Sequence, residues 1–190
     1  MFDEKEILRR CIKQERKAQK LLYEQYSPGL LGVCMRYTGN RAEAEDILQD
    51  GFVKIFNNIK DFEGRSSLIG WMRRIIINTA ITHYHKNLKH QHHYDIDELR
   101  DINVGDCNIE DLEFTREEML GVIESLPAGY KMVFNLYALE GFKHKEIAEQ
   151  LNIDVNTSKS QYSRARKLIQ CRLAALGNKG LVDQNPDIEE

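Results

Sequence analysis

The stretch FKHKEIAEQLNIDVNTSKSQYSRARKLI, residues 142–169, holds two runs of helical apolar spacing on either side of a short polar break. A helix-turn-helix requires two short helices that cross steeply over a turn of about three or four residues. The apolar side chains that would fill the space between these helices are Ile147, Leu151 and Ile153. Ala148 is small where the backbones would approach, and Asn152 tolerates the left-handed conformation of a tight turn. The stretch therefore predicts a helix-turn-helix.

The second predicted helix of this stretch begins after Asp154, whose side chain can cap it. Polar donors come early in this helix and cations late, which suits contacts to base edges and phosphates in a major groove. The predicted DNA-contacting residues are Asn156, Thr157, Lys159, Ser160, Gln161, Arg164 and Arg166. The alternative is an ordinary helical hairpin whose basic face meets water.

A second candidate surface lies upstream, in GRSSLIGWMRRIIIN, residues 64–78, where a polar loop precedes a tryptophan, paired arginines and three isoleucines. An aromatic ring and small polar residues beside cations can stack on an unpaired base and enclose it. The candidate residues are Phe62, Glu63, Gly64, Arg65, Ser66, Trp71, Arg73, Arg74 and Asn78. Ser66 or Ser67 is expected to cap the helix. The alternative is that the tryptophan packs in the core while the arginines face water.

Residues 41–60 predict a third feature, a helix with acidic residues in its first half above an apolar stripe. Asn40 can cap this helix, and Glu43 would complete an arrangement like a capping box. Acidic residues near a helix N-terminus also suit the helix dipole. The helix is therefore either a well-capped member of a bundle or an acidic, partly apolar docking face for a protein partner.

The net charge of −3 conceals an uneven distribution of charge along the chain. Residues 64–94 contain five lysines and arginines and no acidic residue, and residues 159–172 show the same numbers. Between them, residues 95–118 contain ten acidic residues and two arginines. Two basic surfaces separated by an acidic connector attract phosphates even in a chain that is nearly neutral overall.

The remaining segments also show helical spacing, with only three prolines and no long alternating run. We therefore predict an all-α protein of two small helical domains, an N-terminal helical bundle and a C-terminal helix-turn-helix domain, joined by a flexible acidic linker. The predicted ranges of the first domain, linker, second domain and acidic tail are 1–87, 88–111, 112–176 and 177–190. Pro28 is expected to kink or break a helix over residues 16–38.

Metal and cofactor chemistry has little support in the sequence. The histidine-rich segment contains His83, His85, His90, His92 and His93. Its first two histidines diverge on a helix, and no cysteine or carboxylate lies at ligand spacing, so we predict no metal site. The four cysteines are far apart and are expected to be buried hydrophobes without disulfides.

Enzymatic and membrane functions are not expected either. No phosphate-binding glycine loop, nucleophile motif or metalloprotease motif occurs, so we predict no catalytic residue, no cofactor and no enzyme. No apolar run is long enough to span a membrane, and the N-terminus lacks the order of a signal peptide. A cytoplasmic protein without membrane insertion is the expectation.

Three stretches together resemble bacterial RNA polymerase sigma factors of the extracytoplasmic-function group of the sigma-70 family. AEDILQDGFVKIF, residues 44–56, is similar to the segment with which these proteins bind the clamp helices of the polymerase β′ subunit. FEGRSSLIGWMRRIIIN, residues 62–78, is similar to the loop and helix that melt and read the minus-ten element. Residues 126–169 are similar to the domain that reads the minus-thirty-five element.

The resemblance implies a role for each of these surfaces in promoter-specific transcription initiation. It implies polymerase-core contacts from Asp46, Gln49, Asp50 and Phe52. It implies single-strand promoter contacts from the 62–66 loop with Trp71, Arg74 and Asn78, and duplex contacts from Thr157, Lys159, Ser160, Arg164 and Arg166. The implied partners are core RNA polymerase, through its β′ clamp helices and β subunit, and promoter DNA, with an anti-sigma factor as a further candidate.

Two residues depart from the pattern of this family. Ser158 stands where the family usually places an apolar residue that packs inward, and Tyr162 stands where a leucine is usual. The alternative function is a conventional helix-turn-helix regulator that binds duplex operators without polymerase. That alternative leaves the stretches at 44–56 and 62–78 without a purpose.

Overall fold

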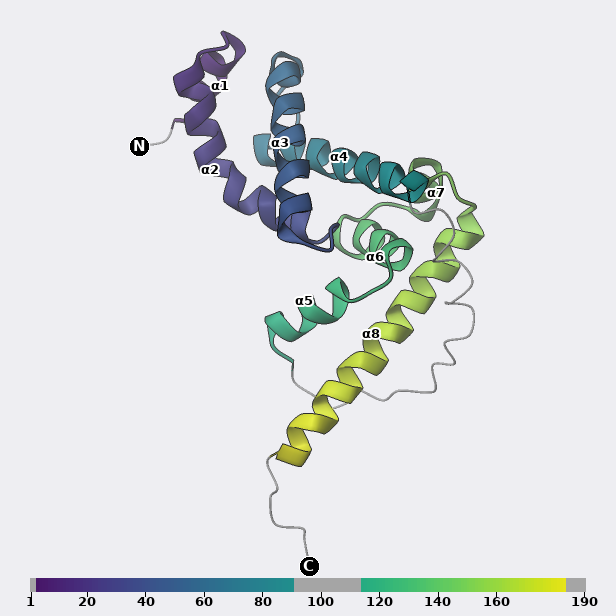
Figure 1. Cartoon of the computed structure of the whole chain (residues 1–190). Coiled ribbons are helices and arrows are strands. Elements are labelled where there is room, and N and C mark those ends of the chain that lie inside the picture. Colours follow the sequence, from purple (N-terminus) through teal and green to yellow (C-terminus); the bar gives the residue numbers. More distant parts are fainter. Residues whose placement is uncertain (1–2, 91–113, 184–190) are drawn as a thin grey trace, which may run out of the picture. The chain divides into compact units, whose positions relative to one another are not determined.

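The computed structural model describes residues 3–90 and 114–183, which are helical with short connections and, within these ranges, contain no strand (Figure 1). The helices are α1 (Glu4–Ile12), α2 (Arg16–Met35), α3 (Arg41–Asn58), η1 (Ile59–Asp61), α4 (Leu68–His90), α5 (Arg116–Glu124), α6 (Ala128–Phe134), η2 (Asn135–Leu139), α7 (His144–Leu151) and α8 (Val155–Asp183). The all-α prediction is confirmed. The chain divides into two compact units, Met1–His90 and Gln91–Glu190. Apart from residues 88–90, the predicted linker lies outside the described residues.

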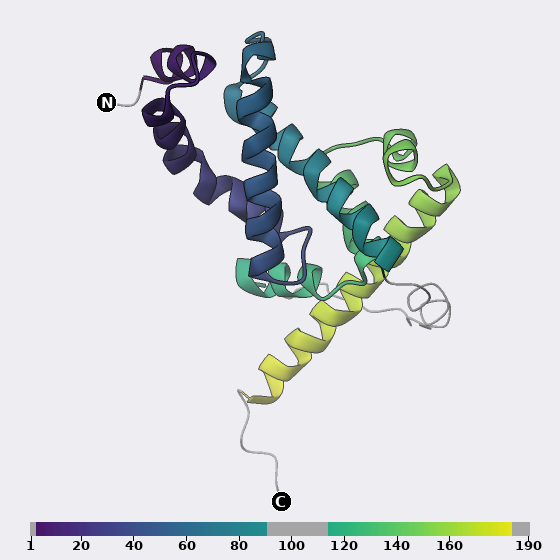
Figure 2. The same cartoon turned by 45° about the horizontal axis from the view of Figure 1, so that its top comes forward.

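The first unit is a bundle in which α2 packs against α1, α3 and α4, and α3 also packs against α4 (Figure 2). Its fully buried residues include Leu22, Leu30, Ile55, Ile59, Leu68, Met72 and Ile76. The cap predicted for α3 is present, because the Asn40 side chain accepts a hydrogen bond from the Glu43 backbone N–H at 2.9 Å. The Asn40 amide in turn donates to the Glu43 carboxylate at 3.0 Å. The first of these bonds satisfies a backbone donor that the helix N-terminus leaves open.

Helix α2 runs unbroken through Pro28, so the break allowed for by the sequence does not occur. Proline inside a helix removes one backbone hydrogen bond. Leu22, which precedes Pro28, and Leu30, which follows it, are both buried in the bundle. Their packing stabilises the helix on either side of the proline.

A close approach between α3 and α4 occurs at Gly51. A Cβ atom added at this glycine would overlap the Cδ1 atom of Ile76, whose side chain is fully buried. Two polar contacts cross the same seam. The Lys54 ammonium donates to the Thr79 hydroxyl at 3.1 Å, and His83 Nε2 lies 2.8 Å from an oxygen of Asp50.

The second unit packs α5 and α6 against the middle of α8. Its apolar cluster consists of Val122, Ile123, Leu126, Tyr130, Ala165, Leu168, Ile169 and Leu173. Thr115 and Glu118 form a capping box at the start of α5. Pro127 precedes α6, and the π-helical turn η2 follows α6 directly.

The helix-turn-helix has the predicted form. Helix α7 spans His144–Leu151, and Asn152 ends it in the left-handed conformation at φ 53° and ψ 49°. Ile147, Ala148 and Leu151 are buried, as predicted, and Ile153 is half-buried. Helix α8 begins at Val155 and extends to Asp183, beyond residue 176, where the predicted second domain ends.

The cysteine prediction is partly wrong. Cys11 and Cys34 are buried and free, and burial raises the pKa of these thiols to about 11 and about 12. Cys171, in contrast, is disulfide-bonded. The wide spacing of the four cysteines along the chain did not reveal this.

Candidate functional site

The first candidate surface is the exposed side of the N-terminal half of α8. Asn156, Lys159, Ser160, Arg164 and Arg166 are exposed, while Thr157 and Gln161 are half-buried. The Ser160 hydroxyl donates to the backbone carbonyl of Thr157 at 3.0 Å, and an Arg164 nitrogen lies 3.5 Å from the Tyr130 hydroxyl. All seven predicted residues therefore lie on one helix, and five of them are exposed to solvent.

The inward side of the same helix contains the two residues that depart from the family pattern. Ser158 is fully buried, and its hydroxyl lies 3.0 Å from Nδ1 of His144. Tyr162 packs among three other rings, those of Phe134, Tyr137 and His144. Burial, and to a smaller extent the nearby Lys159 ammonium, lower the pKa of His144 below its ordinary value. Sequence reasoning noted the unusual serine and tyrosine but missed His144.

The second candidate surface combines the loop before α4 with the first turns of that helix. Ser67 caps α4, because its hydroxyl accepts a hydrogen bond from the Gly70 N–H at 3.2 Å. The rings of Phe62 and Trp71 lie 5.5 Å apart at an angle of 53°. Both rings are half-buried, so the tryptophan is neither a full core residue nor a solvated one. The two rings form an aromatic pair beside the loop.

The loop itself is open to solvent. Glu63, Gly64, Arg65 and Ser66 are exposed, and Gly64 adopts a positive φ of 72° that favours glycine. An ion pair of 2.6 Å joins Arg65 to Glu63. An exposed pair of this kind contributes little to stability, so the arginine can exchange its partner for a phosphate.

The remaining candidates of this surface lie further along α4. Arg74 and Asn78 are exposed one turn apart on the same face, and Arg73 is half-buried. The opposite face of the helix carries Met72 and Ile76, which are fully buried in the bundle. Helix α4 is therefore anchored by one face and presents its polar face to solvent.

The third candidate surface is the acidic face of α3. Asp46, Gln49 and Asp50 are exposed. Phe52, predicted as a contact residue of the same surface, is only 3% exposed, and its ring centroid lies 4.6 Å from that of Tyr23. Phe52 therefore supports the surface from within and does not present its ring to a partner.

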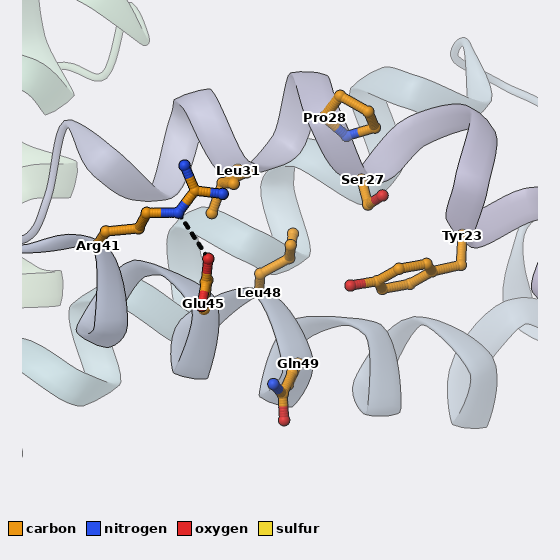
Figure 3. Close-up of a pocket in the computed structure, with 8 residues that line it drawn as sticks. All are labelled: Tyr23, Ser27, Pro28, Leu31, Arg41, Glu45, Leu48 and Gln49. Atoms are coloured by element: carbon orange, nitrogen blue, oxygen red, sulfur yellow. Dashed lines mark hydrogen bonds and ion pairs between the residues drawn. The ribbon is translucent and has the colours of Figure 1, made fainter.

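A pocket of about 400 Å³ lies between α2 and α3 beside this face (Figure 3). Its lining residues are Tyr23, Ser27, Pro28, Leu31, Arg41, Glu45, Leu48 and Gln49. An ion pair of 2.7 Å between Arg41 and Glu45 lies at one end of the pocket, and the Tyr23 ring lies at the other.

Among the residues that the structure describes, no group of three or more His, Cys, Asp or Glu side chains could hold a metal ion. His83 is engaged by Asp50, while His92 and His93 lie outside the described residues. Among the helices described, none combines the length and apolar character that a membrane crossing requires.

Comparison with known proteins assigns both units to one family. Residues 22–89 match the family model of sigma-70 region 2, and residues 116–169 match that of sigma-70 region 4. The ECF RNA polymerase sigma-E factor of Haemophilus influenzae is 28% identical over 181 residues, which cover 90% of this chain and 95% of that protein. The RNA polymerase sigma-H factor of Pseudomonas aeruginosa is 27% identical over 183 residues, with coverage of 91% and 95%.

Among solved structures, the sigma factor RpoE in complex with the anti-sigma factor NepR from Bartonella quintana is similar to 81% of this chain and 95% of that chain. The identity is 22% and the TM-score 0.49.

Proposed function

The chain belongs to the extracytoplasmic-function group of the sigma-70 family, and we propose that it directs core RNA polymerase to a specific set of promoters. The observation that carries this proposal is the presence of both family regions, in order, each with its polar surface exposed on a packed helical scaffold. A regulator that binds operators without polymerase is not favoured, because it would need only the second of these regions.

Core binding is proposed for the acidic face of α3. The exposed side chains of Asp46, Gln49 and Asp50 offer two charges and an amide to a basic partner surface. Phe52 has an indirect role, since it holds this face in place from the core. The proposed partners in the polymerase are the β′ clamp helices, with the β subunit as a second contact.

Capture of the melted minus-ten strand is proposed for the 62–66 loop and the polar face of α4. A base that leaves the duplex costs a few kcal/mol in lost stacking and pairing. The aromatic pair Phe62 and Trp71 can restore stacking, and exposed Arg65 and Arg74 can neutralise phosphates. Arg73 and Asn78 complete the proposed contact set.

Duplex recognition of the minus-thirty-five element is proposed for α8. Its N-terminal donors would meet base edges, and its cations, Arg164 and Arg166 among them, would meet phosphates. The contribution of these cations to the affinity for DNA should fall as the salt concentration rises.

The chain is a regulatory factor, and we propose that the polymerase alone performs the chemistry of initiation. An anti-sigma factor is a further proposed partner, as in the complex of Bartonella quintana RpoE with NepR. We place the protein in the cytoplasm, where polymerase and promoter DNA are found.

The test is transcription in a reconstituted system. Core polymerase with this protein should initiate at defined promoters, and core polymerase alone should not. The protein should also co-purify with the core enzyme. Binding to duplex DNA without either of these results would instead support the operator-binding regulator.

A further inference from the structure

The inward face of α8 contains a polar group that nothing in duplex recognition requires. Ser158 is fully buried at a position next to Thr157 and Lys159, two of the proposed DNA contacts. A buried hydroxyl is costly unless it is hydrogen-bonded. The hydrogen-bond partner that the structure provides is His144 Nδ1, at 3.0 Å, on the first residue of α7.

The His144 ring is itself held in place by other aromatic rings. It stacks on Tyr137 of η2 with a centroid distance of 4.2 Å and an interplanar angle of 13°. Tyr162, one turn after Ser158 on α8, meets the His144 ring edge-on at 5.9 Å. Tyr162 also contacts Tyr137 at 4.5 Å and stacks on Phe134 at 6.0 Å.

These ring contacts and the hydrogen bond connect three successive elements of the domain. Tyr137 comes from the π-helical turn η2, His144 from the start of α7, and Ser158 and Tyr162 from the recognition helix. An apolar contact tolerates sliding and rotation, since it has no direction. A hydrogen bond from a buried side chain on the inner face is directional, and it restricts the rotation of α8 about its own axis.

We propose that His144 and Ser158 are a positioning pair for promoter recognition, whose hydrogen bond sets the rotation of α8 and thereby selects which side chains reach the base edges. This inference rests on the proposed function. Side-chain atoms lie roughly 5–6 Å from a helix axis, so a rotation of about 30° would move them by about 3 Å. A shift of that size is as long as a hydrogen bond of about 2.9 Å and would remove base contacts.

Two substitutions of His144 test its hydrogen-bonding nitrogen and its aromatic ring separately. His144→Phe keeps a ring against Tyr137 but leaves the Ser158 hydroxyl buried without its partner. His144→Asn removes the ring but can place an amide group near the position of Nδ1. Ser158→Ala deletes a single oxygen and removes the same hydrogen bond from the other side.

The measurement uses the reconstituted holoenzyme on a promoter mapped with the wild-type protein. It compares initiation on that promoter with initiation on a copy in which only the minus-thirty-five element is scrambled. We expect His144→Phe to lower this discrimination by about tenfold, the effect of losing one good contact to a base edge. Ser158→Ala should lower it several-fold, and His144→Asn should stay within about threefold of wild type.

Thermal unfolding of the same variants distinguishes positioning from stability. In the double variant His144→Phe with Ser158→Ala, no buried hydroxyl is orphaned, so the unfolding midpoint should recover while discrimination stays low. Discrimination that recovers together with the midpoint would overturn the proposal. So would unchanged discrimination in His144→Phe or, if that variant does not fold, in Ser158→Ala.

A further control separates this inference from the proposed function. Opening of a template that carries only the minus-ten element, and affinity for core polymerase, should be the same in all variants. If the wild-type protein fails to initiate at any promoter, the proposed function fails. If the wild type initiates and discrimination is unaltered in the variants, the positioning pair alone fails.

Discussion

Replacing Gly51 with alanine tests whether the seam between α3 and α4 is as tight as the structure indicates. Two opposing effects determine the result. Alanine favours a helix by about 1 kcal/mol over glycine. The added Cβ would overlap the Cδ1 atom of Ile76, whose fully buried side chain would have to shift. Overpacking of this kind costs about 1–3 kcal/mol.

A matched substitution removes the propensity effect from the comparison. Gly32 lies within α2 of the same unit, and a Cβ added there meets nothing within 4 Å. Both substitutions gain the same helix propensity, so the difference between them measures the overlap at Gly51 alone. We expect Gly32→Ala to be more stable than Gly51→Ala by about 2 kcal/mol.

The assay is thermal unfolding followed by circular dichroism on the purified protein. For a domain of this size, a difference of about 2 kcal/mol corresponds to roughly 10 °C in the unfolding midpoint. Midpoints that agree within about 2 °C would refute the claim that α3 and α4 meet closely at Gly51.

Three further predictions concern the caps, the histidine and the cations. Asn40→Ala removes the cap from the Glu43 N–H and should destabilise the first unit by about 1 kcal/mol, measured by urea unfolding, with little change in the second unit. Because burial and Lys159 lower the pKa of His144, the unfolded chain takes up its proton first as pH falls. Stability should therefore be complete above about pH 6.5 and decline below it, and His144→Phe should remove that part of the slope in thermal unfolding. Arg166→Ala should weaken duplex binding about equally for all sequences and reduce the slope of log affinity against log salt by about 1, whereas an unchanged slope would mean that this arginine does not meet a phosphate.

The sequence predicted the elements that short-range signals control. The turn that ends α7 at Asn152 was predictable because an apolar stripe, a polar break and an asparagine suited to the left-handed conformation coincide within a few residues. The cap of α3 was predictable for the same reason, since Asn40 and Glu43 are three residues apart. Long-range packing was not predictable in this way. Pro28 stays inside α2 because residues on both sides of it are buried in the bundle, which local propensity does not reveal.

In the candidate site, too, features set by neighbouring residues were predictable from the sequence, and contacts between distant residues were not. Phe52 lies four residues after Leu48 and three before Ile55, and all three are buried. The family resemblance suggested a contact residue there, and the structure places the ring in the core. Ser158 was recognisable as unusual, but its partner His144 is fourteen residues earlier, and only the folded chain brings the two within 3.0 Å.

The surfaces of the two functions proposed for the first unit lie on either side of one seam, between α3 and α4. Asp50 faces solvent as a candidate contact for polymerase, yet the same carboxylate lies 2.8 Å from His83 on α4. Nearby, Lys54 of α3 reaches Thr79 of α4, on the helix that carries the candidate contacts for the melted strand. A partner that binds the Asp50 carboxylate would therefore compete with one of the contacts between α3 and α4. The face proposed to bind core polymerase and the face proposed to bind the melted strand therefore lie on two helices that the same side-chain contacts join.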